Sequence, residues 1–373
     1  MNIAILGLGT IGSGVYELLK DSPDIKVKKI LDIKAWMDIM TTNIDDIVND
    51  DSIDVVVETM GGLHPAREFA LRCLEAGKSY VTANKFLVSE YAFELAEAAK
   101  KNNVSFMFSA ACGGGIPYLY NLSKMREIDR IEAVGGILNG TTNYILDKIF
   151  SENQDYASAL ACAQQLGYAE KDPSSDVDGL DTQRKTALAC AVAFGKLPKT
   201  SDIPTFGIRN IAAEDIDYAQ CRHGVFKLMA EAENTEKGVD ASVMPVLCEN
   251  GSSESGIRLN INYAWYRGER IGHFAYIGQG AGKFPTAGNV IKDIYAIMGG
   301  DTSLLPEHLE AAYVSSEKKH TYYVRMAQTV NGRFDAAISN QISNNAFETI
   351  PVALNELITL LGNEQPMFIA EIK

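Results

Sequence analysis

A surplus of positive charge is absent from this sequence of 373 residues, in which 48 aspartates and glutamates face 34 lysines and arginines. The formal net charge of −14 argues against nucleic acid as a partner, because no basic surplus is available to displace counterions from phosphates. No apolar run approaches the length of a bilayer span. The first residues lack the basic segment of a signal peptide and predict a strand instead. We therefore expect a cytoplasmic protein without a membrane partner.

Patterns that would hold a metal ion are absent too. The five histidines show no metal-ligand spacing, and the six cysteines are scattered without a Cys-x-x-Cys pair. Most cysteines lie in apolar or helical contexts, which favours buried thiols in a reducing compartment over disulfides. We expect no catalytic metal. His64 precedes Pro65 at an expected helix start, where a capping or solvated histidine is the commoner case.

The composition that is present is that of an ordinary globular protein. Hydrophobic residues make up 46% of the chain and charged residues 22%. The length is sufficient for two or three domains, each with a core of its own. No internal repeat or low-complexity segment interrupts the chain, so its organisation has to be predicted from local patterns.

A glycine pattern near the N-terminus predicts a dinucleotide site. Residues 2–6 form a short apolar run, and the residues that follow are Gly7-Leu8-Gly9-Thr10-Ile11-Gly12, ahead of a helical pattern. In this context the first glycine permits the tight turn, the second lets the backbone approach a pyrophosphate, and the third lets the helix pack against the strand. Thr10 and Ile11, within the glycine turn, are further candidate cofactor residues, and the N-terminus of the helix that follows would face the phosphates. The alternative is a glycine turn without a ligand.

Strands and helices continue to alternate after this turn, which predicts a parallel sheet. A second strand over residues 25–33 reaches Asp32, about twenty residues beyond the last glycine, where an acid would bind the ribose 2′-hydroxyl and favour NAD. Lys34 could instead bind a 2′-phosphate. NAD is therefore favoured, and NADP is the alternative.

Two further strands extend the predicted cofactor edge. Residues 53–58 are a β-branched run suited to burial in a parallel sheet, and they lead into Thr59. Residues 79–82 lead towards Lys85 in the same way. Because the carboxyl ends of parallel strands meet at one edge, Thr59 and Lys85 are candidate cofactor residues.

The most informative segment is the acidic loop over residues 167–185. Ahead of Lys185 it holds five carboxylates, which belong to Glu170, Asp172, Asp176, Asp178 and Asp181. A helix that begins near Leu180 would place Asp181 and Lys185 at i and i+4 on one face. Carboxylates there would hold the ammonium group of a small zwitterionic substrate, and the lysine could exchange a proton with its reacting oxygen. The alternative is ordinary helix capping with a surface ion pair.

Six blocks of the sequence resemble homoserine dehydrogenase, in the order in which that family carries them. They span residues 1 to about 298, and the region 136–185 is the most specific. The blocks are residues 7–12, Thr82-Ala-Asn-Lys85, Gly113-Gly-Gly-Ile-Pro117, Gly136-Ile-Leu-Asn-Gly-Thr-Thr-Asn-Tyr-Ile-Leu146, residues 166–185 and Gly278-Gln-Gly-Ala-Gly-Lys-Phe-Pro-Thr-Ala287.

The resemblance implies an NAD(P)-dependent oxidoreductase that interconverts L-homoserine and L-aspartate 4-semialdehyde, in the threonine and methionine branch of amino-acid biosynthesis. It implies an α/β fold class, with a Rossmann dinucleotide-binding domain over residues 1–130 that the chain rejoins over about 280–318. An α+β substrate-binding and dimerisation domain with an open mixed sheet would occupy residues 131–279. A small C-terminal α+β tail would follow. The expected partners are small-molecule substrates and a second copy in a homodimer.

The functional residues of the family correspond to positions in these blocks. Lys185 matches the principal acid/base candidate, and Lys85 matches a lysine near both cofactor and substrate. The acids that bind or lie near the homoserine amino group correspond to Glu170, Asp181 and Asp176, and the glycines that contact the cofactor correspond to Gly167 and Gly280. The chemistry agrees, because oxidation of a primary alcohol requires loss of a hydride and loss of a proton to a base.

One departure from the family concerns a monovalent cation. The family commonly has glutamate where this chain has Ser109, and that glutamate helps to bind sodium with backbone carbonyls that match those of Cys112, Gly114 and Ile116. A serine hydroxyl is a neutral and weaker ligand. The three carbonyls remain in the chain, but a sodium site is doubtful.

Two rival functions stay open. Cys112 usually has a small apolar counterpart in the family, so it could be the nucleophile of an acylating semialdehyde dehydrogenase. No histidine base lies near it in sequence, which favours a structural thiol. The other alternative is a non-catalytic paralogue that binds NAD, and the presence of Lys85 and Lys185 together argues against it.

Local patterns also predict the middle of the chain. Residues 228–232 predict a helix, and residues 132–138, 241–248 and 259–266 predict strands. Pro245 falls inside the second of these strands, which predicts a position at a sheet edge.

The tail over residues 319–373 resembles a shortened or degenerate ACT domain, a small βαββαβ regulatory module. Residues 321–327 predict its first strand, residues 352–361 an amphipathic helix and residues 366–372 a final strand. The glycine loop that should open the first helix is represented only by Asn331-Gly-Arg-Phe. We favour a structural or dimer-extending tail over feedback control by an amino acid.

Overall fold

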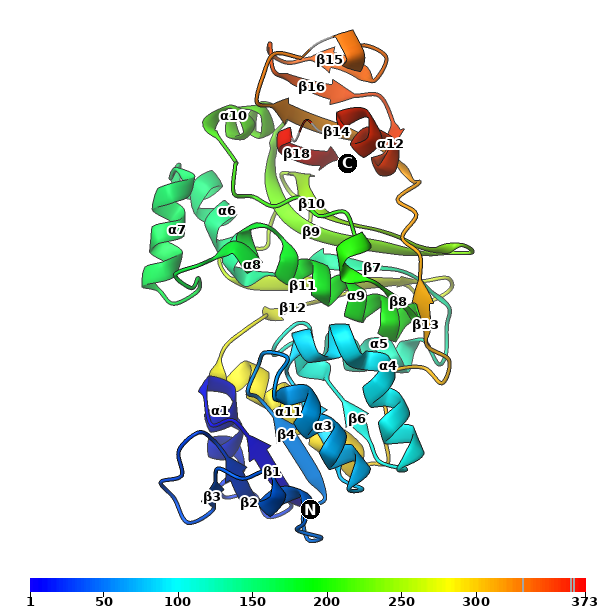
Figure 1. The fold of residues 1–373 in the computed structure, drawn as a ribbon. Coiled ribbons are helices and arrows are strands. Elements are labelled where there is room, and N and C mark those ends of the chain that lie inside the picture. Colours follow the sequence, from blue (N-terminus) through cyan, green and yellow to red (C-terminus); the bar gives the residue numbers. More distant parts are fainter. Residues whose placement is uncertain (331, 363, 365) are drawn as a thin grey trace. The chain divides into compact units, whose positions relative to one another are not determined.

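The computed structural model describes residues 1–330, 332–362, 364 and 366–373. The chain divides into two compact units (Figure 1). The first comprises Met1–Asp129, Ala191–Gly195 and Gly278–Glu310, and the second comprises Arg130–Cys190, Lys196–Ile277 and Ala311–Lys373. Among the described residues, no helix combines the length and the apolar character needed to cross a bilayer.

The first unit is built on a parallel sheet in the order β3-β2-β1-β4-β5-β6. Its strands are β1 (Asn2–Leu6), β2 (Lys26–Leu31), β3 (Met40–Thr41), β4 (Val55–Glu58), β5 (Ser79–Thr82) and β6 (Phe106–Met107). The central strands β1 and β4 are almost fully buried, which explains their aliphatic sequences. Strand order reverses between β1 and β4, and in such sheets the ligand crevice lies outside the carboxyl ends of the strands at that point.

Helices connect these strands. They are α1 (Thr10–Leu19), α2 (Asp45–Val48), α3 (Ala66–Glu75), α4 (Lys85–Lys101) and α5 (Tyr118–Met125), with the short helix η1 (Ser109–Ala111). A later helix, α11 (Lys283–Met298), returns to this unit and packs against α1 and η1. The chain therefore closes the first unit with a segment that lies far away in sequence.

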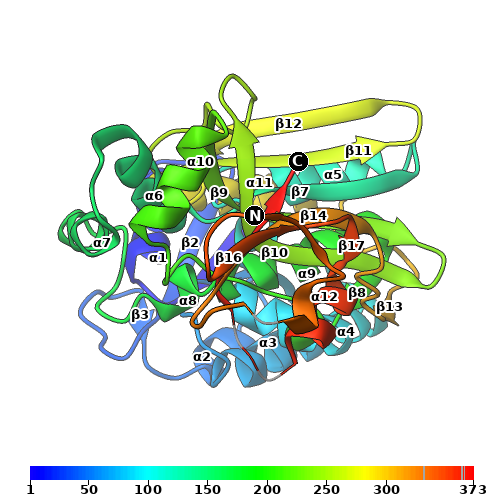
Figure 2. The same cartoon turned by 90° about the horizontal axis from the view of Figure 1, so that it is seen from above.

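The second unit holds a mixed sheet in the order β12-β11-β7-β9-β10-β18-β14-β16-β15, and β17 pairs with β14 off this path. Its strands are β7 (Ile131–Ile137), β9 (Gly224–Thr235), β10 (Gly238–Glu249), β11 (Ile261–Gly268), β12 (Gly272–Gln279), β14 (Lys319–Met326), β15 (Ile338–Gln341), β16 (Ala346–Thr349), β17 (Val352–Ala353) and β18 (Pro366–Ile372). Figure 2 shows β11 and β12 running side by side at one end of this sheet. The predicted α/β fold class, a Rossmann domain with a second domain on an open mixed sheet, is confirmed.

The helices of the second unit include α6 (Gly140–Glu152) and α10 (Ala213–Cys221), both of which pack on β9. The others are α7 (Tyr156–Gln165), α8 (Ser174–Val177), α9 (Leu180–Phe194) and α12 (Leu354–Leu361). Short elements complete the chain: β8 (Lys196–Pro198), η2 (Thr200–Asp202), β13 (Glu310–Ala312) and η3 (Gly332–Phe334). The start of α9 at Leu180 agrees with the sequence-based expectation.

Two local predictions were wrong. Residues 228–232 form the middle of β9 and not a helix, although leucine, methionine, alanine and glutamate all favour helices. Here Ala230 lies opposite Gly136 of β7 on one side and Val243 of β10 on the other, so pairing on both sides overrides local propensity. Pro245 does not lie on an edge strand either, because β10 lies between β9 and β18 and pairs with both.

The tail continues the sheet of the second unit. Its strands follow the chain as β14, β15, β16 and β18, and they lie in the order fourth, first, third, second. That is a βαββαβ arrangement in which the one-turn helix η3 stands where the first helix would be. Asn331, part of the loop predicted to open that helix, lies outside the described residues. Strand β18 pairs in parallel with β10 at Val246 and Leu247, which joins the tail to the strands of the sheet that precede it in the chain (Figure 1).

A buried polar seam also ties the tail to α10. The Arg325 guanidinium binds the Asp215 carboxylate through two contacts of 2.8 Å, and Asp215 is completely buried. The Tyr323 hydroxyl donates to the same carboxylate at 3.0 Å. The rings of Tyr218 and Tyr323 stack with 4.0 Å between their centroids. A buried ion pair of this kind is costly to break, because the remaining partner would be an unpaired buried charge.

Candidate active site

The turn between β1 and α1 has the geometry of a dinucleotide-binding loop. A side chain at Gly12 would collide with the Gly7 carbonyl oxygen and would lie 2.7 Å from Thr59 Oγ1, so only glycine lets α1 begin this close to the strand. Thr59 donates its hydroxyl to the Gly7 carbonyl at 2.8 Å and braces the turn. Gly9, by contrast, is exposed, and an added Cβ there would meet no atom within 4 Å. The turn is packed on its inner side and open on its outer side.

The first turn of α1 is suited to a phosphate. Its N-cap residue is Gly9, which has no side chain to satisfy the backbone N–H groups of the first turn. Thr10 is exposed and Ile11 is half-buried at this helix start. Unpaired N–H groups at the positive end of a helix bind phosphate groups well, so these residues fit the pyrophosphate of a dinucleotide.

Asp32 follows β2 and is tied to the glycine turn. Its Oδ2 accepts a hydrogen bond of 2.6 Å from the Leu8 backbone N–H, and its Oδ1 accepts one of 2.7 Å from the Ile33 N–H. A carboxylate has further lone pairs for a ribose hydroxyl. Lys34 lies two residues further and is exposed.

The carboxyl edge of β4 and β5 carries a polar network that sequence reasoning missed. Glu58 is completely buried, and burial raises the pKa of its carboxyl group. It accepts from the Thr82 hydroxyl at 2.6 Å and from the Met60 N–H at 2.7 Å. Asn84 caps α4 by accepting from the Leu87 N–H at 3.2 Å. The available signal was a glutamate at the end of an otherwise aliphatic strand.

This edge positions Lys85. As the first residue of α4, it follows directly after the capping Asn84 and is half-buried. The Asn84 amide also donates to the Gly62 carbonyl at 2.7 Å, which links the helix start to the loop after β4. Thr59 and Lys85 therefore lie in the segments that follow neighbouring strands, Thr59 directly after β4 and Lys85 at the start of α4, at the same edge of the sheet.

In the second unit, the base of α9 holds the predicted lysine and acids. Lys185 Nζ lies 2.7 Å from Asp181 Oδ2, one helical turn away, and both side chains are buried. Lys185 also donates to the Leu138 backbone carbonyl at 2.7 Å. The alternative of a solvated surface pair is thereby contradicted, since Asp181 is 3% and Lys185 7% exposed.

Asn139 organises the carboxylates around this lysine. Its Nδ2 donates to Asp176 Oδ1 at 2.7 Å and to Asp181 Oδ2 at 2.9 Å, so both amide hydrogens are used. Its Oδ1 accepts from the Thr142 N–H at 2.9 Å and caps α6. In the sequence, Asn139 is recognisable only as part of the block over residues 136–146. Its asparagine-glycine-threonine context signals a helix cap but gives no sign of the two carboxylates.

The carbonyl that Lys185 binds is held in place by the sheet. The Asn262 amide donates to the same Leu138 oxygen at 2.9 Å. Gly136, two residues before Leu138, has φ +139°, and a side chain there would collide with the Tyr263 carbonyl of β11. Glycine thus lets β7 pair closely with β11, and this pairing positions Leu138 and Asn139, which follow β7 directly, beside Lys185.

The other carboxylates of the acidic loop have different partners. Asp178 forms a two-contact ion pair with Arg209 at 2.7 and 2.8 Å. Asp172 accepts from the Ser174 N–H at 3.1 Å and from its hydroxyl at 2.6 Å. Both therefore shape the loop. Of the five predicted acids, Asp176 and Asp181 share the Asn139 amide.

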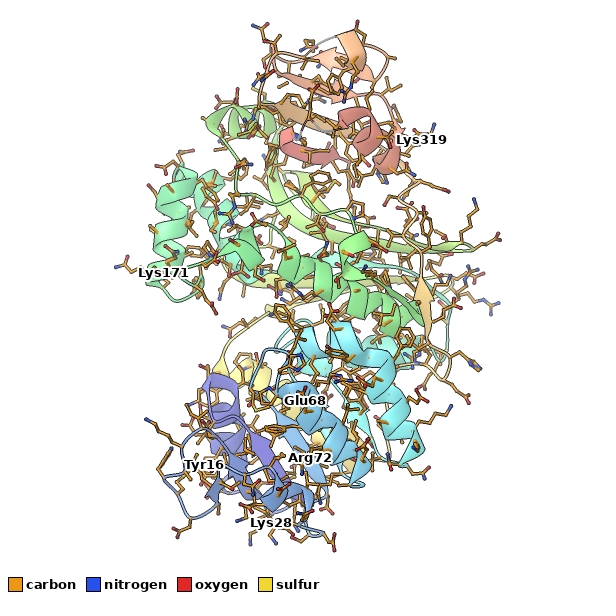
Figure 3. The ribbon with its side chains drawn as sticks, viewed as in Figure 1. Tyr16, Lys28, Glu68, Arg72, Lys171 and Lys319 are labelled. Carbon is orange, nitrogen blue, oxygen red and sulfur yellow. The ribbon has the colours of Figure 1, made fainter. Side chains whose placement is uncertain are left out.

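Glu170 lies in the exposed part of the loop. Its backbone carbonyl accepts from the Gln164 amide at 3.0 Å, and its neighbour Lys171 points outwards (Figure 3). Gly167, with φ +75°, is exposed nearby, and an added Cβ there would meet no atom within 4 Å. The structure thus brings Asp176, Asp181 and Lys185 together and leaves Glu170 at the rim of its loop.

The residues around the doubtful sodium site do not fit a metal ion. The Ser109 hydroxyl donates to Asp293 Oδ1 at 2.5 Å, so it is already committed to a carboxylate. The Asn289 amide nitrogen donates to the Gly114 carbonyl at 2.8 Å and to the Ile116 carbonyl at 3.1 Å. Two of the three carbonyls that would bind the ion are therefore turned towards an N–H donor. Among the described residues, no group of three histidine, cysteine, aspartate or glutamate side chains could hold a metal ion.

The six cysteines are free thiols, and Cys112 is completely buried. A thiol without solvent exposure cannot receive a substrate carbonyl, so the structure gives no support to Cys112 as a nucleophile. His64 is exposed, lies before the start of α3 and bonds through Nδ1 to Glu68 Oε1 in the first turn of that helix at 2.7 Å, which agrees with a solvated histidine.

The Rossmann sheet with its open glycine turn and the buried lysine–carboxylate site define a nicotinamide-dinucleotide-dependent oxidoreductase. Comparison with known proteins makes this specific. The family model "Homoserine dehydrogenase, NAD binding domain" matches residues 7–109, and the model "Homoserine dehydrogenase" matches residues 117–295. The chain belongs to the homoserine dehydrogenase family.

Individual relatives agree with this assignment. The homoserine dehydrogenase of Synechocystis sp. is 39% identical over 322 residues, which cover 81% of this chain and 74% of that protein. The crystal structure of a homoserine dehydrogenase from Thiobacillus denitrificans superposes with a TM-score of 0.89 at 28% identity, covering 100% of this chain and 98% of that one. A hyperthermophilic archaeal homoserine dehydrogenase in complex with NADPH shares the fold at 24% identity, with a TM-score of 0.71 over 81% of this chain and 99% of that one. The family resemblance, the enzyme class and a nicotinamide dinucleotide as cofactor are confirmed.

Proposed function

We propose that this chain interconverts L-homoserine and L-aspartate 4-semialdehyde with Lys185 as the acid/base residue. The observation that carries this assignment is the buried Lys185, paired with Asp181 and bound to the Leu138 carbonyl beside carboxylates that Asn139 holds. The nicotinamide dinucleotide, when bound, accepts the hydride in oxidation and supplies it in reduction. We propose that the enzyme acts in the cytoplasm, in the threonine and methionine branch of amino-acid biosynthesis.

Lys185 moves the proton. In the oxidative direction its neutral amine takes the proton of the substrate hydroxyl, and in the reductive direction its ammonium returns a proton to the carbonyl oxygen. Asp181 and the Leu138 carbonyl fix the Nζ atom from two sides, so the lysine does not have to be ordered at the moment of reaction. Lys85, at the start of α4, is the second proposed catalytic lysine.

The carboxylates recognise the amino group of the substrate. Asp176 and Asp181 are brought together by one amide, so a substrate ammonium between them would meet two acceptors in place. Glu170 is the third residue proposed to bind the substrate amino group. Its exposed position in the acidic loop would let it contact a substrate that approaches from solvent. These carboxylates distinguish an amino-acid alcohol from a simple alcohol, which has no cation to offer them.

We propose NAD as the preferred cofactor. The support is Asp32, whose carboxylate is fixed against the glycine turn by the Leu8 N–H. The Asp32 carboxylate can accept a hydrogen bond from a ribose hydroxyl, and its negative charge repels the additional 2′-phosphate of NADP. The exposed Lys34, in contrast, could form an ion pair with that phosphate. The turn residues Gly7, Gly9, Thr10, Ile11 and Gly12, with Thr59 and Lys85, would hold the dinucleotide, and Gly167 and Gly280 are the further proposed contacts.

We further propose a homodimer that forms through the substrate-binding domain, residues 131–279. Its edge strand β12 exposes Phe274 by 44% and Ile277 by 64%, apolar surface that a second copy could cover. The first domain, residues 1–130 with about 280–318, would bind the cofactor, and the ACT-like tail over 319–373 would be structural.

The assay that tests this function is formation of NADH or NADPH from L-homoserine. Replacement of Lys185 by alanine is expected to lower turnover by about 10²–10⁴-fold, the usual contribution of a general acid/base, while cofactor affinity stays nearly unchanged. Lys171→Ala is the matched control, since Lys171 is an exposed lysine of the same acidic loop. Full activity of the Lys185→Ala enzyme would remove the assignment of this lysine.

Two outcomes separate the rival functions. Intact NAD binding by the unmodified chain without any turnover of homoserine would favour a binding-only paralogue. Loss of activity on alkylation of Cys112 in the folded enzyme would revive the thiol mechanism, whereas its complete burial predicts no reaction.

A further inference from the structure

The loop that links η1 to α5 is held by one buried amide. Asn289, on α11, is 4% exposed, and its Nδ2 donates to the carbonyls of Gly114 and Ile116 at 2.8 and 3.1 Å. Both neighbours are acceptors only, so the nitrogen and not the oxygen of the amide has to face them. One asparagine thus gathers two loop carbonyls that are two residues apart.

A cation gathers carbonyl oxygens in the same way. A monovalent ion would sit among several oxygens, and it would need them to point at a common centre. Here the Gly114 and Ile116 oxygens already point at a common atom, the amide nitrogen, which supplies partial positive charge through its two hydrogens. A metal ion cannot occupy the position of this nitrogen, whereas the Asn289 Oδ1 has no hydrogen-bond partner among the described residues.

Buried groups of both charge signs lie beside the loop. Asp293, one turn further along α11, is completely buried and accepts from both the hydroxyl and the N–H of Ser109, at 2.5 and 2.8 Å. Its neighbour Lys292 brings a buried ammonium, whose Nζ lies 4.2 Å from the centre of the Tyr120 ring. Carboxylate and ammonium are therefore both supplied by the protein.

We propose that the Asn289 amide takes the place of a monovalent cation between the Gly114 and Ile116 carbonyls, so that this enzyme keeps its structure and its turnover without sodium or potassium. The loop it holds is also bound to the segment before α11, since the Gly115 N–H donates to the Gln279 carbonyl at 3.1 Å. That segment contains Gly280, a proposed cofactor contact. The amide is thus a fixed internal brace on this part of the first unit.

The first experiment uses the unaltered enzyme. Its thermal unfolding midpoint and its rate of NADH formation from homoserine are measured in tetramethylammonium chloride, and sodium or potassium chloride is then exchanged in at constant ionic strength. Neither quantity is expected to change. A saturable rise in either one would overturn the proposal. The rate measurement rests on the proposed function, but the unfolding midpoint does not. The role of the Asn289 amide can therefore be tested even if the chain does not oxidise homoserine.

The second experiment removes the amide. In Asn289→Ala two buried carbonyls lose their donor, which should lower the unfolding midpoint by about 2–4 °C and turnover on the order of tenfold. Sodium or potassium should restore part of both losses, whereas tetramethylammonium, which is too large, should restore neither. In Asn289→Asp a carboxylate faces the same carbonyls, so the expected dependence on a small cation is stronger.

The matched control is Asn102→Ala. Asn102 is a half-buried asparagine of the same unit whose amide donates to one helix carbonyl, that of Ala98, at 2.8 Å. Its loss should not be compensated by any cation. If small cations restored neither Asn289 variant, or restored the Asn102 variant equally, the amide would not be standing in for an ion.

Discussion

The glycine turn of the first unit and the lysine site of the second unit are constructed in opposite ways. The turn works through side chains that are missing: Gly12 lets the helix begin close to the strand, and Gly9 leaves the outer side open. The lysine site works through polar side chains that are present, buried and mutually bonded, as Lys185 and Asp181 are. The first is specified by spacing along the chain, whereas the second is specified by contacts across it. This difference decides which substitutions each site tolerates.

The largest effect is expected where added atoms have no room. Gly12→Ala should abolish measurable NAD binding and lower stability by about 1–3 kcal/mol, because the new methyl group collides with the backbone of the turn. Gly9→Ala meets open space, so it should leave the unfolding midpoint unchanged and weaken only NAD binding. Calorimetric NAD titration and thermal unfolding separate the two quantities. Equal destabilisation by both alanines would show that the turn is not packed on one side only.

A smaller effect is expected at Asn139. Asn139→Ala leaves Asp176 and Asp181 without their shared donor, which should raise the KM for homoserine and lower kcat/KM by about 10–100-fold with NAD affinity unchanged. Asn139→Asp should be worse, because a third carboxylate would repel the other two. The test is to measure KM and kcat/KM by steady-state kinetics, with homoserine and NAD varied in turn. A loss confined to NAD affinity would place Asn139 outside the substrate site.

Cofactor choice should respond to Asp32. Asp32→Asn removes the negative charge beside the expected ribose position, and we expect the preference for NAD over NADP to fall about tenfold. Asp38→Asn, an exposed aspartate of the same loop, is the control and should change nothing. The ratio of kcat/KM for the two cofactors is the measurement. An unchanged ratio in Asp32→Asn would assign the choice to another residue.

The smallest effect concerns a buried lysine outside both sites. Burial lowers the pKa of Lys227 to about 8, although it donates to the Ile257 carbonyl at 2.6 Å. Between pH 8 and its ordinary pKa the unfolded chain binds more protons at this residue than the folded one, so its contribution to stability rises with pH there. The unfolding free energy of the native protein minus that of Lys227→Met should increase by at most about 1.4 kcal/mol per pH unit in this range. A flat or falling difference would contradict the assigned pKa.

The same contrast explains what the sequence could reveal. The Rossmann half was predictable because β1 and β4 are short, largely aliphatic runs and the glycine spacing is local. The helix predicted over residues 228–232 failed because β9 is specified by neighbours on both sides, β7 and β10. Local propensity does not report such pairing.

The candidate site was predictable to a similar extent. Asp181 and Lys185 stand one helical turn apart, so their pairing could be read from spacing. Asn139 lies 37 and 42 residues from the acids it binds, and Asn289 lies 175 residues from Gly114. No periodic pattern encodes contacts of that separation. The functional roles of all the candidate site residues, Lys185 and Asp181 included, stay predictions.

The continuous sheet of the second unit has a consequence for shortening this protein. Strand β18, the last element of the chain, pairs with β10, and the Arg325–Asp215 ion pair closes beside it. Cutting the tail away would strip hydrogen-bond partners from the flank of β10 and strand a carboxylate in an apolar interior. A truncated enzyme would therefore expose an unpaired edge strand. We expect it to self-associate in solution before its catalytic activity changes.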